Sequence, residues 1–312
     1  MLIDSILVIV GCTLLYFGGE RVVEGSSRIA RGLRISPLII GVTVVAFGTS
    51  LPEAFVSIVA ALKGNQDICV SNIIGSNIVN IGLILGLAAF LCPLNVDKTL
   101  LRHELPFMLG ISAVFVVMSW DYQVSRFEGA VLFVLFLLFN FWMIHKTRSN
   151  ARVENTQTEQ AHTLLKDSLF VLLGFALLVA GALLLVDGAS SIAEFLGIPA
   201  WIIGITVVSI GTSLPELAAS VIAALKKEGD ISLGNIVGSN IFNILFVIGS
   251  SALIMPLRLD PSTYPRSDLL IMIAFSAALY PFLRSRYVLA RVEGVILLIG
   301  YAGFMAFLFL RH

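Results

Sequence analysis

Long apolar segments separated by short polar ones follow one another along the whole chain. Each is about 17 to 27 residues long, enough to cross a hydrocarbon core of roughly 30 Å as a helix. The apolar runs are too continuous for the strands of a membrane β-barrel, the other structure that satisfies its backbone in lipid. The pattern predicts an all-α polytopic membrane protein with about ten transmembrane helices. The predicted spans lie near residues 4–20, 37–62, 68–92, 104–120, 127–145, 168–187, 199–225, 231–256, 268–283 and 291–310.

The second half of the chain repeats the first. Thr49 and Thr212 stand 163 positions apart, and this shift aligns residues 35–94 with 198–257 without a gap. About half of the aligned pairs are identical, which indicates duplication of a whole unit. The predicted domains are a first five-helix repeat at 1–145, a polar cytoplasmic linker at 146–166 and a second five-helix repeat at 167–312.

Loop charges indicate that the two repeats cross the membrane in opposite directions. An odd number of helices per repeat reverses the orientation of the second copy, and Lys and Arg collect in cytoplasmic loops. The loop after the first predicted helix carries Arg21, Arg28, Arg31 and Arg34, whereas its counterpart at 187–198 has no basic residue. We therefore expect ten helices in two inverted repeats, with the N- and C-termini outside the cytoplasm.

Several acidic residues stand at the ends of predicted helices. Glu20 and Glu24 follow the first apolar segment, and Asp187 ends the sixth. We expect them to be solvated charges at the membrane interface, because the interface is the least costly place for charge in a spanning helix.

Composition agrees with an integral membrane protein. Hydrophobic residues make up 58% of the 312 residues, charged residues 13%, and the mean hydropathy is +0.97. These values lie far outside the range of soluble globular domains, so the lipid bilayer is the expected partner. Twenty basic residues balance twenty acidic ones, so no net charge favours nucleic acid. The first apolar run has no basic residue before it, which argues against a cleaved signal peptide, although Ile9–Cys12 is similar to a lipoprotein processing site.

A hexapeptide that contains a glutamate occurs once in each repeat. Gly-Thr-Ser-Leu-Pro-Glu at Gly48–Glu53 recurs at Gly211–Glu216, each time inside an apolar segment. A charged side chain within the hydrocarbon layer usually faces a cavity or a partner and marks an ion or substrate path. The proline lacks an N–H and breaks the helix, which frees carbonyl groups that a cation can engage. Two copies of the motif predict one shared site.

The next helix of each repeat adds a polar stripe. Its residues are spaced by four and therefore share one helix face: Asn72, Ser76 and Asn80, and again Asn235, Ser239 and Asn243. Together with the glutamates they offer only oxygen donors, which suit hard cations such as Ca²⁺ or Na⁺. The four histidines have no zinc spacing, so we expect no resident cofactor. We expect Asn77 and Asn240 to bridge helices rather than bind ions.

The hexapeptides and the segments Gly75–Asn80 and Gly238–Asn243, of pattern Gly-Ser-Asn-Ile-x-Asn, resemble the paired repeats of the cation/Ca²⁺ exchanger superfamily. The chain resembles prokaryotic Na⁺/Ca²⁺ exchangers in particular, and the resemblance covers both halves. It implies a ten-helix antiporter of alternating access in a prokaryotic inner membrane, in which Na⁺ entry drives Ca²⁺ out. Ca²⁺ and Na⁺ are then substrates, and the protein is not an enzyme.

The resemblance also implies which residues hold the ions. By motif position, it implies that the carboxylate ligands are Glu53 and Glu216 and that Thr49 and Thr212 supply backbone carbonyls. It implies that the sodium-coordinating hydroxyls belong to Ser50, Ser213, Ser76 and Ser239, and that the carbonyls of the flanking sodium sites belong to Ala46 and Ser209. The remaining central groups are Asn80 and Asn243. Several sodium-coupled relatives have Asp at one or both of the last two positions. The missing carboxylate leaves the driving ion open.

Three other functions compete with sodium-driven exchange. Ca²⁺/H⁺ exchange is the leading alternative, because an intramembrane Glu can take up a proton instead of sodium. An intramembrane hydrolase could use Ser50 or Ser213, but no intramembrane His is available as a base. A channel shares the oxygen lining, whereas inverted repeats with broken helices are typical of alternating access.

Overall fold

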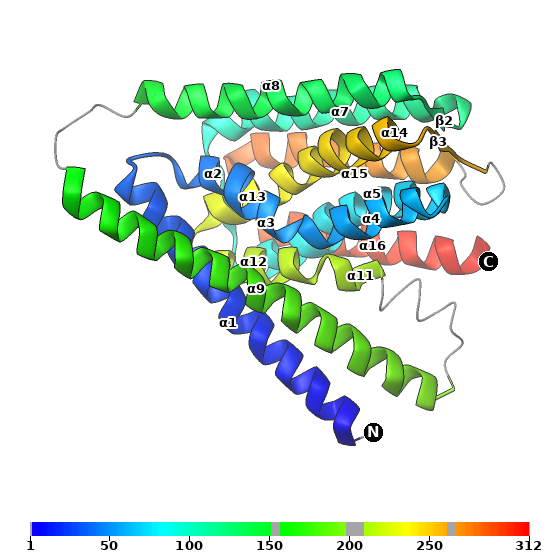
Figure 1. Ribbon diagram of the computed structural model, residues 1–312, viewed down its shortest axis with the longest axis horizontal. Coiled ribbons are helices and arrows are strands. Elements are labelled where there is room, and N and C mark those ends of the chain that lie inside the picture. The colour runs from blue at the N-terminus through cyan, green and yellow to red at the C-terminus, as the bar shows by residue number, and fades with distance from the viewer. Residues whose placement is uncertain (1, 151–156, 198–208, 261–265, 312) are drawn as a thin grey trace.

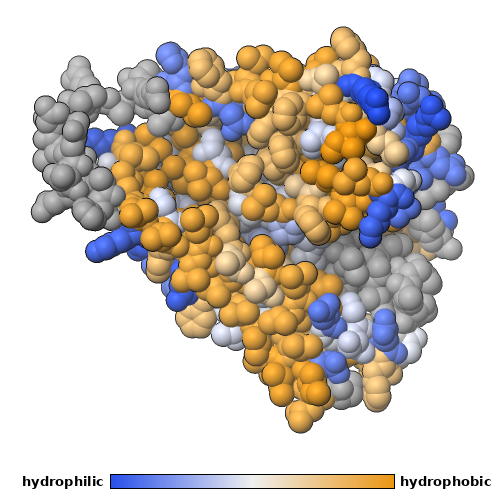
Figure 2. Space-filling model, viewed as in Figure 1, coloured by the Kyte–Doolittle hydropathy of each residue, from blue (hydrophilic) through white to orange (hydrophobic). Residues whose placement is uncertain are grey.

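Helices make up nearly all of the structure. The computed structural model describes residues 2–150, 157–197, 209–260 and 266–311. Most helices lie side by side in one body, and α1 (Leu2–Gly32) and α9 (Gln157–Phe195) cross it together as a diagonal pair (Figure 1). Figure 2 shows apolar residues over the middle of one face and hydrophilic residues gathered toward the ends of the helices. This distribution fits a bundle whose midsection faces lipid.

Short helices and π-helical turns interrupt the first half. After α1 come α2 (Pro37–Ile40), the π-helix η1 (Gly41–Val45), α3 (Ala46–Thr49), α4 (Leu51–Leu62), α5 (Gln66–Val79), the π-helix η2 (Asn80–Leu85), α6 (Gly86–Leu91), β1 (Leu94–Asn95), the π-helix η3 (Leu100–Glu104), α7 (Leu105–Met118), the 3₁₀ turn η4 (Ser119–Asp121), β2 (Gln123–Val124) and α8 (Arg126–Asn150).

The second half follows a similar order, but its described residues have no counterparts of η3 and η4. After α9 come α11 (Ser209–Thr212), α12 (Leu214–Leu225), α13 (Gly229–Phe242), the π-helix η6 (Asn243–Ile248), α14 (Gly249–Ile254), β3 (Leu257–Arg258), α15 (Arg266–Arg286), β4 (Val288–Leu289) and α16 (Arg291–Arg311). Residues 151–156 of the expected linker lie outside the described residues, and α8 and α9 extend into it from both sides.

The prediction of an all-helical polytopic membrane protein is confirmed. Within the described residues, eight helices are long and apolar enough to cross a membrane, and the bent pair Pro37–Thr49 and Leu51–Leu62 counts as a ninth. The predicted span at 199–225 lies partly outside the described residues. Its described part consists of α11 and the 12-residue α12.

The predicted ends of two helices were wrong. The first helix continues from the predicted end at residue 20 to Gly32, and the sixth continues past residue 187 to Phe195. Glu20, Glu24 and Asp187 therefore lie within helices and not at their ends. No proline follows the apolar segments to stop either helix, and α1 gains ion pairs that compensate its charges.

Two short antiparallel ladders join the halves reciprocally. Strand β1 pairs with β4 through Leu94 and Leu289, and β2 pairs with β3 through Val124 and Leu257. Leu94 and Leu257 are equivalent positions of the repeat. Each half thus contributes the same strand to a ladder with the other half, as two copies related by a twofold rotation would.

Close glycine contacts hold α1 against α9. A Cβ placed on Gly18 would lie 2.8 Å from the Leu178 nitrogen, and one on Gly11 would lie 2.8 Å from the Gly181 oxygen. Small residues at such crossings let two membrane helices approach closely enough for backbone contact. The pair can therefore behave as one packed unit.

We expect Gly18→Ala to destabilise the protein by about 1–3 kcal/mol, because the added methyl group would overlap backbone atoms of α9. Thermal unfolding of the purified protein in detergent measures this effect. Gly110→Ala in α7 is the matched control, since a Cβ there meets no atom within 4 Å. Equal melting temperatures for the two variants would contradict the proposed close contact.

Candidate functional site

The hexapeptide breaks its helix at the same residue in both halves. Helix α3 ends at Thr49 and α4 begins at Leu51, with a 47° bend between the two parts. Ser50 at the break has φ −84° and ψ 6°, and Ser213, between α11 and α12, has φ −91° and ψ 8°. Each following proline is in the first turn of a helix, where its missing N–H leaves no bond unmade. The glutamate therefore begins a new helix at a break in the membrane span.

The two breaks face each other. Ser50 Oγ donates a hydrogen bond to Glu216 Oε1 at 2.7 Å, and Ser213 Oγ donates one to Glu53 Oε1 at 2.9 Å. The glutamates are 1% and 0% exposed. The two acids from opposite halves thus lie close together in the structure, as predicted. The reciprocal serine contacts that join them were not predicted from the sequence.

The polar stripes fasten each hexapeptide helix to the next helix of its own half. Asn72 Nδ2 donates to Ser57 Oγ and Asn235 Nδ2 donates to Ser220 Oγ, both at 2.9 Å. Thr49 Oγ1 also donates to Asn235 Oδ1 at 3.1 Å and so joins the halves. These contacts hold the broken helices in place around the two acids.

Four asparagines form a reciprocal clasp between the halves. Asn80 Nδ2 donates to Asn240 Oδ1 at 2.9 Å, and Asn243 Nδ2 donates to Asn77 Oδ1 at 3.1 Å. Asn77 and Asn240 bridge helices, as expected from the sequence. A π-helical turn begins at both Asn80 and Asn243, and such turns are frequent at functional sites. Because the clasp uses the amide nitrogens of Asn80 and Asn243, their oxygens remain available for another group.

Six buried oxygen atoms at this centre have no hydrogen-bond partner in the structure. They form three pairs related by the repeat: Oε2 of Glu53 and Glu216, Oγ of Ser76 and Ser239, and Oδ1 of Asn80 and Asn243. Buried polar atoms in proteins nearly always have a partner. Symmetric pairs of unpartnered oxygens, two of them on carboxylates, are the donor set that a hard cation needs.

The remaining predicted ligands are less clearly placed. The Ala46 carbonyl accepts a hydrogen bond from Ser50 N at 3.1 Å, so a sodium ion there would compete with this donor. Thr212 is half-buried at the end of α11. Ser209 begins α11, and its side chain lies outside the described residues. The carbonyl roles of Thr49, Thr212, Ala46 and Ser209 stay predictions.

Sequence reasoning missed one neighbour of the centre. Asn77 Nδ2 lies 3.8 Å from the sulfur of Met272 on α15, so this methionine borders the asparagine clasp. In the sequence, a single Met in an apolar span cannot be distinguished from a residue that faces lipid or fills the core.

Fold and geometry together define a class: a polytopic membrane protein whose two halves bring buried, unpartnered oxygen atoms to its centre. Comparison with known proteins narrows this class. The model of the family described as sodium/calcium exchanger protein matches residues 4–145 and 167–310. CaxA of Alkalimonas amylolytica is 42% identical, covering 99% of both chains, and the inner membrane protein YrbG of Escherichia coli is 39% identical, covering 99% of this chain and 98% of YrbG.

A solved structure is similar over its whole length. The sodium-calcium exchanger NCX_Mj, soaked with 10 mM Na⁺ and zero Ca²⁺, has a TM-score of 0.86 and 33% identity, with 98% of each chain covered. The chain belongs to the sodium/calcium exchanger protein family. It is an integral membrane antiporter of the exchanger type, as the resemblance implied.

We expect Glu53→Gln to raise the melting temperature of the ion-free protein at pH 8. The substitution removes one of two neighbouring buried carboxylates, and desolvation of a buried charge costs several kcal/mol. Scanning fluorimetry in a chelator, with choline in place of Na⁺, measures the change. The control is Glu128→Gln. Oε2 of Glu128 accepts hydrogen bonds from the N–H and the hydroxyl of Ser125, and loss of this carboxylate should lower the melting temperature. A lower value for Glu53→Gln would contradict the expectation.

We expect Asn240→Leu to weaken Ca²⁺ binding by roughly tenfold to a hundredfold, the range seen when a group that orients a metal ligand is removed. Asn80 would lose the acceptor that fixes its amide. Titration calorimetry of the purified protein measures the affinity. Asn140→Leu is the control, because the Asn140 amide donates only to its own helix, at Phe136 O. Equal affinities in both variants would show that the clasp does not orient the site.

Proposed function

We propose that this protein is a secondary antiporter that exchanges Na⁺ for Ca²⁺ by alternating access, with ten transmembrane helices in two inverted five-helix repeats. The observation that carries the proposal is the set of six unpartnered buried oxygens, contributed in equal pairs by the two halves. Membership of an exchanger family and the reciprocal strand and serine contacts support it.

The charges of the site suit both substrates. Glu53 and Glu216 supply two negative charges, which balance one Ca²⁺ or two Na⁺. Ca²⁺ takes six to eight oxygen ligands at about 2.3–2.6 Å, and the centre offers six oxygens before any backbone carbonyl is counted. Two ions that need the same carboxylates compete for them, so occupancy by Na⁺ excludes Ca²⁺. Competition at a single site is the simplest basis for exchange.

The neutral ligands favour sodium over protons as the driving ion. A proton-coupled site needs only its two acids, because protonation of Glu53 and Glu216 would release Ca²⁺ by itself. Here two buried serines, Ser76 and Ser239, also leave their hydroxyl oxygens unpartnered. Hydroxyl oxygens are hard, neutral ligands, and they serve a monovalent cation that replaces Ca²⁺. Ca²⁺/H⁺ exchange is the alternative that the experiment must separate, because Asn stands at both 80 and 243.

Location follows from the relatives and from loop charges. YrbG is named an inner membrane protein of E. coli. We assign this chain to the inner membrane of a prokaryotic cell, with the Arg-rich end of α1 and the turn between α12 and α13 on the cytoplasmic side, where basic residues collect.

Flux in proteoliposomes tests the proposal. Protein reconstituted with Ca²⁺ inside should release it when Na⁺ is added outside, and a protonophore should not change the rate. Glu53→Gln and Glu216→Gln should each abolish release, because one carboxylate cannot balance a dehydrated divalent ion. Glu128→Gln, outside the centre, should retain it. Release driven by a pH gradient and indifferent to Na⁺ would replace the proposal with Ca²⁺/H⁺ exchange, and release in both site variants would overturn the site.

A further inference from the structure

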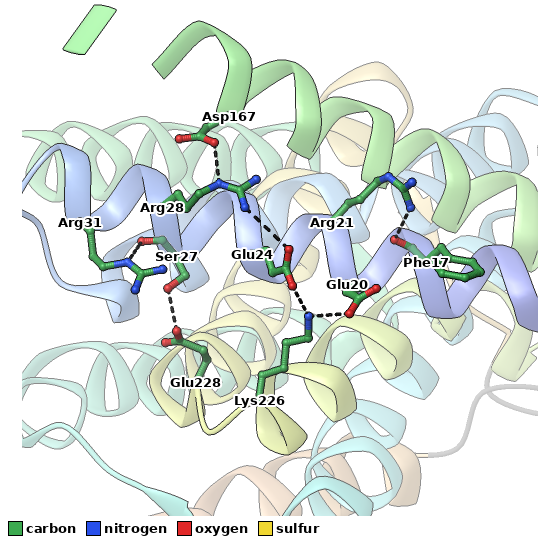
Figure 3. Close-up of polar contacts among 10 residues, drawn as sticks. All are labelled: Phe17, Glu20, Arg21, Glu24, Ser27, Arg28, Arg31, Asp167, Lys226 and Glu228. Atoms are coloured by element: carbon green, nitrogen blue, oxygen red, sulfur yellow. Dashed lines mark hydrogen bonds and ion pairs between the residues drawn. The ribbon is translucent and has the colours of Figure 1, made fainter. Parts of the chain in front are cut away.

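A group of charged residues joins the cytoplasmic end of α1 to α12 (Figure 3). Lys226, the residue that caps the C-terminus of α12, places its Nζ 2.8 Å from Glu20 Oε1 and also binds Glu24 Oε1. Its side chain is 29% exposed, and those of the two acids are 31% and 43% exposed. One lysine therefore holds two successive turns of α1 against the helix that carries Glu216.

Neighbouring contacts extend this connection to α13 and α9. Ser27 Oγ donates to Glu228 Oε1 at 2.7 Å, in the turn between α12 and α13. Arg28 Nε donates to Asp167 Oδ1 at 2.6 Å and so ties α1 to α9 at the same end. The α1–α9 pair is thus fastened as one unit to the turn after α12.

Apolar packing continues the contact along α12. A Cβ on Gly19 would lie 2.6 Å from Ile222 Cδ1, which shows how closely α1 covers this helix. Ile222 is 7% exposed and Leu214 is 8% exposed. At this end of the molecule, α1 therefore covers the surface of the helix that leads to the ion site.

The equivalent surface of the first half is uncovered. With the shift of 163 positions, Lys63 stands for Lys226, Asp187 for Glu24 and Leu51 for Leu214. Lys63 and Asp187 are both exposed, and Leu51 is 43% exposed against 8% for its counterpart. Equivalent positions of the two repeats thus have different environments in one structure. Among the described residues, α1 covers α12, whereas Leu51, Lys63 and Asp187 are left exposed beside α4.

We propose that Lys226, Glu20 and Glu24 form a latch that holds the cytoplasmic end closed, and that Lys63 and Asp187 form the equivalent latch when the opposite end closes. The role of the latch in transport rests on the proposed alternating-access function. Its physical basis does not. Lys226 and Lys63 cap the C-termini of α12 and α4, and Glu24 on α1 and Asp187 on α9 stand at matching positions of the repeat. Glu20 has Leu183 as its counterpart, so the second latch has a single carboxylate. Breaking one ion pair must shift the balance toward the other arrangement.

Distances between spin labels test the latch without requiring transport. Label pairs at Leu33 and Leu225 report the latched end, and pairs at the equivalent positions Leu196 and Leu62 report the opposite end. All four positions are exposed, and the three cysteines are replaced first, Cys69 by Ala because it is buried. Measurements are made on full-length protein in nanodiscs, without Ca²⁺ or Na⁺.

Lys226→Gln should lengthen the Leu33–Leu225 distance and shorten the Leu62–Leu196 distance, with a two- to fivefold change in the ratio of the two populations, the range that a partly exposed ion pair supplies. Glu20→Gln combined with Glu24→Gln should do the same. Lys227→Gln, an exposed neighbour, should change neither distance. Adding Lys63→Gln to Lys226→Gln should reverse part of the shift, because it weakens the opposite latch.

Unchanged distances in Lys226→Gln would overturn the latch, whatever the transported ions. A shift in Lys226→Gln that Lys63→Gln does not reverse would overturn the second latch and leave the first. Failure of the proposed function has a different signature, because Na⁺ would then release no Ca²⁺ from proteoliposomes while the distances still responded to Lys226→Gln.

Discussion

The structure depends on the burial of two carboxylates at one point in the membrane. A charge in a low-dielectric interior is tolerated only when it is paired or neutralised. Here each acid receives one hydroxyl hydrogen bond from the opposite half and keeps one oxygen without a partner. Serine contacts alone do not compensate two charges, and the proposed cation would supply the missing compensation. In the proposed site, the other polar groups of the centre would supply oxygens to that cation or hold those oxygens in place.

The fold meets this requirement through pairs of equivalent contacts between the two halves. The serine–glutamate contacts, the asparagine clasp and the strand ladders each occur twice, with the roles of the halves exchanged. Each half alone would bury an acid and an amide with too few partners. Both halves are therefore needed to provide partners for these groups. This requirement explains why these polar residues, inside apolar segments, are the same in the two copies of the repeat.

Outside the centre the two halves differ, and the difference concerns access to it. Helix α1 covers α12 through an ion pair and an apolar contact, while the matching surface of α4 is exposed. A protein that opens its site to each side in turn needs a rigid centre and a movable cover. In the proposed alternating-access cycle, the hydrogen-bonded broken helices would be the rigid centre and the glycine-packed α1–α9 pair the movable cover.

The sequence by itself determined the class and the duplication, and it singled out polar residues that the structure buries, because charge and proline inside apolar segments have few structural explanations and the second copy excluded chance. It also predicted that Asn77 and Asn240 bridge helices. It could not show that Ser50 serves the acid of the other half, nor that α1 continues past Glu20 as a helix. Those facts depend on contacts between residues about 160 to 200 positions apart, such as Lys226 with Glu20. Local pattern records which faces are polar, and only tertiary packing decides which polar faces meet.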